Sequence, residues 1–252
     1  MPSSSRKIRS YSQLPLNVGD TVELPKRSSH HLVKVLRLDS NDAIELFNGD
    51  GFNYQATLKL VGKSAHAEIL SKSKNIAEAS IALNVVQGIS RGDKMDTTIQ
   101  KCVELGVCSI IPVYTAHSIK PLAVDRANRK HEHWQQIAVS AAEQCGRSVV
   151  PKVHAPIELN HYLSSANHSP EEPTHLKLVL DPMGTSALDR HAEVAKATVL
   201  VGPETGFSDQ ELTAALSKGF STIVLGPRIL RTETAAPAAL AAMQSLFGDF
   251  LQ

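Results

Sequence analysis

Residues 224–240, VLGPRILRTETAAPAAL, place two arginines, two threonines and a glutamate between an apolar run and an alanine-rich run. The apolar run is typical of a buried strand, and the alanine-rich run is typical of a helix. A plain connection between a strand and a helix needs only a turn residue or two and a cap. The concentration of both kinds of charge at this connection therefore predicts a functional site.

Around this stretch, from Ile81 to the end of the chain, runs typical of strands alternate with runs typical of helices. The predicted strands are IALNVVQGI, SIIPVYT, LKLVLDP, ATVLVGP and STIVLGP, and the predicted helices cover residues 93–106, 127–147, 208–219 and 234–250. Such alternation indicates an α/β fold with a mostly parallel sheet that is covered on both faces.

Three of the predicted strands end alike, at Pro182, Pro203 and Pro227. Ligands of parallel sheets bind beyond the carboxyl ends of the strands, and a proline there stops the ladder because it lacks an N–H group. Gly-Pro is also common at ordinary turns. Because the polar runs ETGFS and RILRTET follow two of the three exits directly, a shared ligand pocket is the favoured interpretation.

The N-terminal part has shorter strand signals. DAIELFNGDGFNYQATLKLVG is two strand-like runs joined at NGDG, where Asn, Asp and Gly favour a tight hairpin. TVELP and SAHAEILSKS indicate further strands, and SSHHLVKVLR indicates one short helix with a serine cap. We expect a small β-barrel-like domain over residues 1–72 and a second domain over residues 73–252, with SKSKNIAEAS as the linker.

The composition is that of an ordinary globular protein, with 42% hydrophobic and 20% charged residues. Three cysteines without CxxC spacing argue against a disulfide scaffold and a cysteine zinc site, and the 11 histidines form no spaced set of metal ligands. We therefore expect no metal. MPSSSRKIRS does not resemble a secretory signal, and no apolar run approaches the roughly 18 residues that span a bilayer. These features predict a cytoplasmic protein without a membrane partner.

The net charge of +1 hides an asymmetry, because residues 1–74 contain 11 lysines and arginines against 7 acidic residues. A basic N-terminal part suits a phosphate-bearing partner, although an ordinary solvated surface explains so small a surplus equally well. No GxxxxGK[ST] run occurs, so the sequence gives no sign of a P-loop triphosphate site.

Two motifs carry a resemblance to a known family. GPETGFSDQE followed by LGPRILRTETA resembles the paired signature of the SPOUT methyltransferases, specifically the family that methylates N3 of a uridine in 16S ribosomal RNA (uridine 1498 in the family's usual substrate). HHLVKVLR, FNGDGFNYQA, DKMDTTIQKCVELGV and AAEQCGRSVVPKV are similar to that family in order and spacing. The resemblance extends over almost the whole chain.

The resemblance implies a PUA-like RNA-binding β-barrel, followed by a SPOUT α/β domain with a deep C-terminal trefoil knot. General rules of chain connection would otherwise reject such a knot. It also implies S-adenosylmethionine as methyl donor, a homodimer, and 16S ribosomal RNA within the small ribosomal subunit as partner. The cofactor would lie at the three strand exits, against Leu180, Gly202, Pro203, Glu204, Gly206, Leu225, Gly226, Pro227, Leu230, Thr232 and Thr234.

The chemistry of the uracil ring explains the charged residues within residues 224–240. Uridine N3 is a weakly acidic imide, so its methylation requires removal of the proton or stabilisation of the resulting anion. We expect Arg231 to stabilise the uracil anion, Glu233 to act as the base, and Glu204 to face the cofactor or assist as a base. A structural alternative is that Thr232 or Thr234 caps the helix while Glu233 complements the helix dipole.

That alternative leaves Arg228 and Arg231 unexplained, because positive charge is unfavourable at a helix N-terminus. An anionic partner resolves the conflict, so Arg228 is expected to contact RNA. Arg6, Lys7 and Arg9 could contact RNA phosphates as well, or belong to a disordered basic tail.

One departure from the family pattern concerns the loop after Pro203. The family usually has GPEGG where this chain has GPETG, with Thr205 at the first of the paired glycines. A β-branched residue at positive φ is strained. We therefore expect a negative φ at Thr205.

Two other functions stay open at this point. The chain could be a related SPOUT enzyme that acts on another RNA site or on a ribose oxygen. It could also be a catalytically silent RNA-binding protein of ribosome assembly, which would have no reason to bind S-adenosylmethionine.

Overall fold

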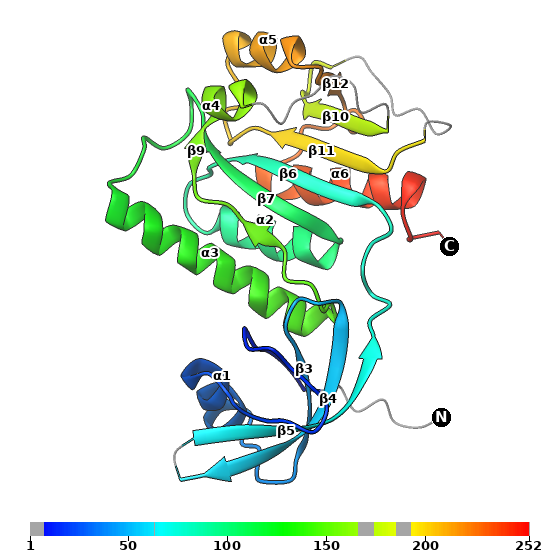
Figure 1. The fold of residues 1–252 in the computed structure, drawn as a ribbon. Helices are drawn as coiled ribbons and strands as arrows, with labels where there is room; N and C mark the ends of the chain where they lie inside the picture. The colour runs from blue at the N-terminus through cyan, green and yellow to red at the C-terminus, as the bar shows by residue number, and fades with distance from the viewer. Residues whose placement is uncertain (1–7, 63, 166–173, 185–192, 252) are drawn as a thin grey trace. The chain divides into compact units, whose positions relative to one another are not determined.

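The computed structural model describes residues 8–62, 64–165, 174–184 and 193–251. The contacts divide the chain into two compact units (Figure 1). The first unit comprises residues 1–78 and 142–150, and the second comprises residues 79–141 and 151–252. No composition shift in the sequence indicates that residues 142–150 group with the first unit.

The first unit is built on one five-stranded sheet. Its strands are β1 (Arg9–Tyr11), β2 (Thr21–Glu23), β3 (Ala43–Phe47), β4 (Phe52–Val61) and β5 (Ser64–Lys74), in the order β1-β3-β4-β5-β2. The hairpin predicted at NGDG is confirmed, because β3 and β4 pair antiparallel and Gly49 and Gly51 have φ of 95° and 83°. Side chains such as Leu46 and Leu58 alternate into a core of buried residues. β5 runs into the segment that the sequence suggests as a linker.

The short helix of the first unit differs from the expectation. It consists of α1 (Lys26–His30) and a π-helical turn, η1 (His31–Val35), and it begins two residues before the predicted serine cap. Pro25 stands at the N-cap without a side-chain hydrogen bond, while Ser29 Oγ donates to the Leu24 carbonyl oxygen instead. The predicted serine cap is therefore wrong.

The second unit contains the parallel sheet that the alternating pattern predicts. Its strands are β6 (Ala82–Gly88), β7 (Val107–Tyr114), β8 (Lys152–Val153), β9 (Ile157–Glu158), β10 (His175–Leu180), β11 (Lys196–Val201) and β12 (Ser221–Ile223). The order is β12-β10-β11-β6-β7-β8, with β9 also on β7, and every one of these pairs is parallel. The carboxyl ends of β12, β10, β11 and β6 therefore meet at one edge.

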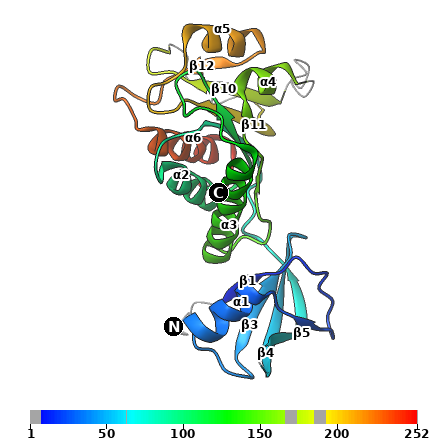
Figure 2. The ribbon, with the colours of Figure 1, turned by 90° about the vertical axis from the view of Figure 1, so that its left-hand side faces the viewer.

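Helices cover both faces of this sheet (Figures 1 and 2). They are α2 (Lys94–Glu104), α3 (Val124–Cys145), α4 (Leu159–Ser164), α5 (Asp209–Ser217) and α6 (Thr232–Phe247). On one face, α4 and α5 pack with strand residues in a core that includes Leu163, Val179 and Phe220. On the other face, α2 and α6 pack against each other, and α2 buries Met95 and Ile99 at helical spacing.

Several elements follow their sequence signals closely. Ser208 caps α5 in a capping box with Glu211, and Gly106, with φ of 84°, follows the end of α2. The two-residue strands β8 and β9 and the single-turn helix α4 have no clear periodic signal, and the last helix ends at Phe247 rather than at residue 250. The polar stretch SSANHSPEEP lies mostly outside the described residues. The trefoil knot stays a prediction.

Among the described residues, no helix is long and apolar enough to cross a membrane. The same part of the chain contains no group of three or more histidine, cysteine, aspartate or glutamate side chains that could hold a metal ion.

Candidate active site

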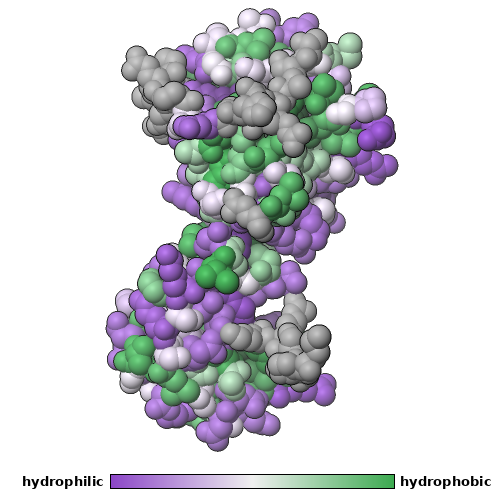
Figure 3. Space-filling model, turned by 90° about the vertical axis from the view of Figure 1, so that its right-hand side faces the viewer, coloured by the Kyte–Doolittle hydropathy of each residue, from purple (hydrophilic) through white to green (hydrophobic). Residues whose placement is uncertain are grey.

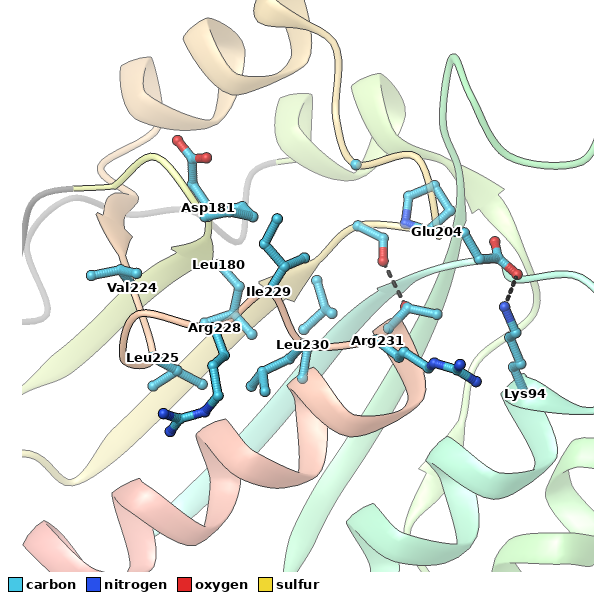
Figure 4. Close-up of a pocket in the computed structure, with 17 residues that line it drawn as sticks. Lys94, Leu180, Asp181, Glu204, Val224, Leu225, Arg228, Ile229, Leu230 and Arg231 are labelled. Carbon is cyan, nitrogen blue, oxygen red and sulfur yellow. Dashed lines mark hydrogen bonds and ion pairs between the residues drawn. The ribbon is translucent and has the colours of Figure 1, made fainter.

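A cavity of about 340 Å³ lies in the second unit, at the edge where the carboxyl ends of β10, β11 and β12 meet (Figure 4). The segments after these strands and the first turns of α2 and α6 form its walls. The lining residues are Lys94, Leu180, Asp181, Pro182, Val201, Gly202, Pro203, Glu204, Gly206, Val224, Leu225, Arg228, Ile229, Leu230, Arg231, Thr232 and Ala235. The pocket predicted from three strand exits is therefore present.

The structure gathers most of the predicted cofactor residues at this cavity. Leu180, Gly202, Pro203, Glu204, Gly206, Leu225, Leu230 and Thr232 line it, whereas Gly226, Pro227 and Thr234 do not. Leucine, isoleucine and valine side chains make much of the wall, and these suit a flat apolar ring. Ile229 is 83% exposed, so a ligand that covers it removes apolar surface from water.

Hydrogen bonds among Thr232, Gly202 and Gln87 stabilise the base of the cavity. Thr232 Oγ1 donates to the Gly202 carbonyl oxygen at 2.7 Å and accepts from Gln87 Nε2 at 3.0 Å. Gln87 is fully buried at the end of β6. These bonds connect the exit of β11 and the end of β6 to the start of α6.

The expected threonine cap is therefore absent from α6. Arg231 is the N-cap residue, and it makes no side-chain cap bond. Thr232 is the first helical residue, and its hydroxyl serves the Gly202 carbonyl. Thr234 is exposed on the first turn. The threonine-cap part of the structural alternative is wrong, because the Thr232 oxygen holds the adjacent strand exit, whereas Glu233 does stand in the first turn of α6.

Close backbone contact explains the glycine at the end of β6. A Cβ atom on Gly88 would lie 2.6 Å from Pro203 Cδ and 2.7 Å from the Pro203 nitrogen. Real Cβ atoms essentially never approach so closely, so a side chain here would displace the exit of β11. Gly88 thus allows β6 and the segment with Glu204 to pack together.

Glu204 is held at the rim of the cavity by two groups of the segment that leads into α2. Its Oε1 lies 3.0 Å from Lys94 Nζ and accepts the Arg91 backbone N–H at 3.1 Å (Figure 4). Partial burial raises the pKa of Glu204, but hydrogen bonds from its own backbone N–H, from Lys94 and from Arg91 outweigh burial and hold the pKa below its ordinary value. Glu204 is therefore ionised at neutral pH, and it is a weaker base than an unpaired carboxylate.

Arg228 and Arg231, the two arginines of residues 224–240, both line the cavity. Figure 4 shows Arg231 pointing toward Lys94 and Glu204, and Arg228 pointing to the opposite side. Neither guanidinium has a hydrogen bond or an ion pair with any residue that the structure describes. Arg231 also stands at the N-terminus of a 16-residue helix, where the dipole disfavours a cation. The lack of a described partner for either guanidinium and the unfavourable helix dipole at Arg231 both favour binding of an anionic ligand beside these side chains.

Glu233 occupies the first turn of α6 but does not line the cavity. Its Oε2 is buried and has no hydrogen-bond partner within the described part of the chain. A buried carboxylate oxygen without a partner is costly, so it requires an explanation. Its role as a base stays a prediction.

The structure changes the place of the predicted RNA contacts in the first unit. Arg6 and Lys7 lie outside the described residues. The Arg9 side chain is only 7% exposed, and it pairs with Glu45 at 2.7 Å. It also donates to the carbonyl oxygens of Ala142 and Arg147 and to side chains on β4 and after α3. Since protein acceptors occupy its donors, Arg9 joins residues 142–148 to the sheet rather than presenting a charge to RNA.

Four exposed cations of the first unit lie on or next to the helical segment, within residues 26–37. Lys26, Arg27, Lys34 and Arg37 are exposed, and no acidic residue occurs in this range. Arg37 has a φ of 57°, which is uncommon for a residue other than glycine. This surface is not among the predicted RNA contacts, although the absence of acidic residues from KRSSHHLVKVLR is a signal for it in the sequence.

Thr205 has the backbone conformation that the sequence predicts. Arg37 and Asn41 are the described non-glycine residues with positive φ, so Thr205 has a negative φ, and Gly206 takes the positive value of 73°. The Thr205 hydroxyl donates to the His117 carbonyl oxygen at 3.4 Å.

Thr205→Gly is expected to lower the free energy of unfolding by about 0.4–1 kcal/mol, because glycine adds freedom to the unfolded chain where no strain needs relief. Thermal melts of both proteins, with and without S-adenosylmethionine, measure the change. A higher melting temperature for the ligand-free glycine variant would contradict the conformation described here.

Comparisons with known proteins agree with this site. The RNA methyltransferase domain profile matches residues 77–244, and the RNA methyltransferase PUA domain profile matches residues 24–70. Ribosomal RNA small subunit methyltransferase E of Buchnera aphidicola is 31% identical over 98% of this chain and 96% of the relative. The protein of the same name from Bacillus subtilis is 31% identical over 88% of this chain and 89% of the relative.

Two solved structures are similar over nearly the whole chain. Ribosomal RNA small subunit methyltransferase E from Neisseria gonorrhoeae, bound to S-adenosylmethionine, is 40% identical with a TM-score of 0.87, over 97% of this chain and 99% of that one. A Legionella pneumophila structure in complex with the same cofactor is 32% identical with a TM-score of 0.89, over 97% of this chain and 100% of that one.

Proposed function

This chain belongs to the RNA methyltransferase family, and we propose that it transfers the methyl group of S-adenosylmethionine to N3 of a uridine in 16S ribosomal RNA. The observation that supports this function most strongly is the cavity at the strand exits, with an arginine at the start of α6 that has no partner in the part of the chain that the structure describes. The family profile and the relatives' names agree with an RNA substrate.

The cavity fits S-adenosylmethionine in size and chemistry. Its volume of about 340 Å³ lies in the range of small-molecule sites, and its apolar wall around Leu180, Leu225 and Leu230 suits the adenine ring. Gly202 and Gly206 carry no side chain, so their backbone itself forms part of the cavity wall. When bound, the cofactor supplies an electrophilic methyl group on a sulfonium centre.

We assign Arg231 the central role in activating the uracil. Before N3 attacks, its imide proton passes to the base and negative charge spreads onto the ring oxygens; formation of the N3–methyl bond, as the methyl–sulfur bond of the donor breaks, then consumes that charge. A guanidinium fixed beside the ring stabilises that charge without reorganisation during the reaction. Arg231 has no hydrogen-bond or ion-pair partner among the described residues, and this supports the role, since no described protein group competes with the substrate for the guanidinium.

The choice of base lies between two carboxylates. Glu204 is paired with Lys94, and its lowered pKa makes it a poor proton acceptor. Glu233 has a buried oxygen without a partner in the described structure. We give Glu204 the task of ordering the rim, and Glu233, which lies on the first turn of α6 outside the cavity lining, stays the proposed base.

The two domains expected from the sequence divide the work in this proposal. The domain over residues 1–72 binds RNA, with the exposed cations of residues 26–37 as the contact surface, and residues 73–252 carry out the transfer. The resemblance further supports a homodimer and a cytoplasmic location with the ribosome. Figure 3 shows apolar side chains gathered on the drawn face of the second unit, which is compatible with a subunit interface.

Calorimetry and product analysis separate this function from the alternatives. The protein is expected to bind S-adenosylmethionine and to transfer labelled methyl groups to unmodified 16S ribosomal RNA, from which 3-methyluridine is recovered. Recovery of a 2′-O-methylated nucleoside would identify a related enzyme of different specificity. RNA binding without any cofactor binding would identify a silent assembly protein.

A further inference from the structure

A fourth strand exit contributes to the cavity, in addition to the three that end in proline. After β6, the segment SRGDK leads into α2, and its last residue, Lys94, lines the cavity beside Arg231. Glu204 approaches this segment from the exit of β11, and it accepts from both Lys94 Nζ and the Arg91 backbone N–H. The Lys94–Glu204 ion pair therefore spans two walls of the cavity at its rim (Figure 4).

This ion pair is easily exchanged for another partner. The side chains of Lys94 and Glu204 are 36% and 29% exposed, so water screens their attraction. Exposed pairs of this kind are favoured over their separated state by at most about fivefold. A partner of higher charge density can therefore take the lysine from the carboxylate.

Glu204 does not depend on the lysine for its position. Its Oε1 also accepts the Arg91 backbone N–H, and its own backbone N–H bonds to the carboxylate. These donors hold the carboxylate in place when Lys94 leaves. Arg91 itself has an exposed side chain, and that side chain has no partner among the described residues.

We propose that Lys94 binds a phosphate of the RNA backbone next to the target uridine, and that Glu204 holds the lysine at the rim until RNA arrives. The inference rests on the proposed function, because a nucleotide placed with its uracil against Arg231 brings its flanking phosphates to the rim of the same cavity. The phosphate replaces Glu204 as the partner of Lys94, and the carboxylate keeps its backbone donors.

The test compares the salt dependence of RNA affinity among matched variants. The binding of unmodified 16S ribosomal RNA is measured between low and high salt for the wild-type protein and for Lys94→Gln, Glu204→Gln and the double variant. Lys101→Gln is the control, because Lys101 pairs with Glu104 on the same helix, is similarly exposed and does not line the cavity. Calorimetry with S-adenosylmethionine on each protein reports whether the cavity is intact.

Lys94→Gln is expected to reduce the slope of log affinity against log salt by about 1, the loss of one phosphate contact. Lys101→Gln should keep the wild-type slope, and Lys94→Gln should keep cofactor affinity within about twofold. Glu204→Gln should tighten RNA binding by up to about fivefold, and the gain should vanish in the double variant.

Two results would overturn the inference. The first is a wild-type slope for Lys94→Gln, and the second is weaker RNA binding by Glu204→Gln, which would mean that RNA needs the ion pair intact. Failure of the wild-type protein to bind this RNA would instead overturn the proposed function, so the two failures are distinguishable.

Discussion

Replacing Arg231 with alanine is expected to lower the rate constant of methyl transfer by about 10²–10³-fold while the affinity for S-adenosylmethionine changes by less than about twofold. The guanidinium has no hydrogen bond or ion pair within the described structure, so its removal leaves no protein group unpaired. The N-cap backbone of α6 should persist, because the Arg231 carbonyl oxygen, rather than the side chain, accepts from Thr234 and Ala235. We therefore expect the lower rate constant to come from the step in which the uracil becomes anionic.

Single-turnover kinetics with saturating cofactor measure this change directly. Arg228→Ala is the matched control, because Arg228 lines the same cavity but points to the other side (Figure 4). It should weaken RNA binding and leave the rate at saturating RNA close to that of the wild type. Equal loss of cofactor affinity and rate in Arg231→Ala would show that Arg231 builds the cavity and does not act on the uracil.

Gly88→Ala is expected to weaken S-adenosylmethionine binding by about tenfold or more, which corresponds to about 1.4 kcal/mol. The added Cβ would lie 2.6 Å from Pro203 Cδ and 3.1 Å from the Gly202 carbonyl carbon. The exit of β11 must then shift, and with it the groups that border the cofactor. Overpacking of this kind also costs about 1–3 kcal/mol of stability.

A substitution at a second glycine, Gly62, is the control that separates a loss of cofactor affinity from a general loss of stability. Gly62 lies in the hairpin between β4 and β5, with a φ of 61° and open space around its Cβ position. Gly62→Ala should lower stability through backbone strain while cofactor affinity stays unchanged. Calorimetry and thermal melts on both variants make the comparison. Wild-type cofactor affinity in Gly88→Ala would contradict the close contact between β6 and the β11 exit.

Local patterns in the sequence predict much of the second unit. Its strands are apolar runs bounded by turn signals, and α2 and α5 carry apolar spacing with a glycine stop or a capping box. The two-residue strands β8 and β9 are too short to show a period, and they form because β7 offers a free edge. Pairing of this kind depends on long-range contact, which local patterns do not report.

The sequence predicts where the candidate site lies, but not the long-range contacts that hold its residues in place. Strand exits with proline locate the cavity, because the end of a parallel strand is a property of local sequence. The buried Gln87 was not predicted, because its partner Thr232 lies 145 residues away in the chain. For the same reason the sequence suggests Arg9 as a contact to RNA phosphates or as part of a basic tail, since its acceptors on residues 142–148 are equally remote in the chain.

Mass spectrometry of 16S ribosomal RNA from a strain without this protein tests the central claim most directly. The strain is compared with the same strain carrying either the wild-type protein or Arg231→Ala. The account predicts that one uridine lacks a methyl group at N3 in the deletion strain, that the wild-type protein restores it, and that Arg231→Ala does not. An unchanged methylation pattern in the deletion strain, or a missing methyl group at a ribose oxygen, would contradict the account.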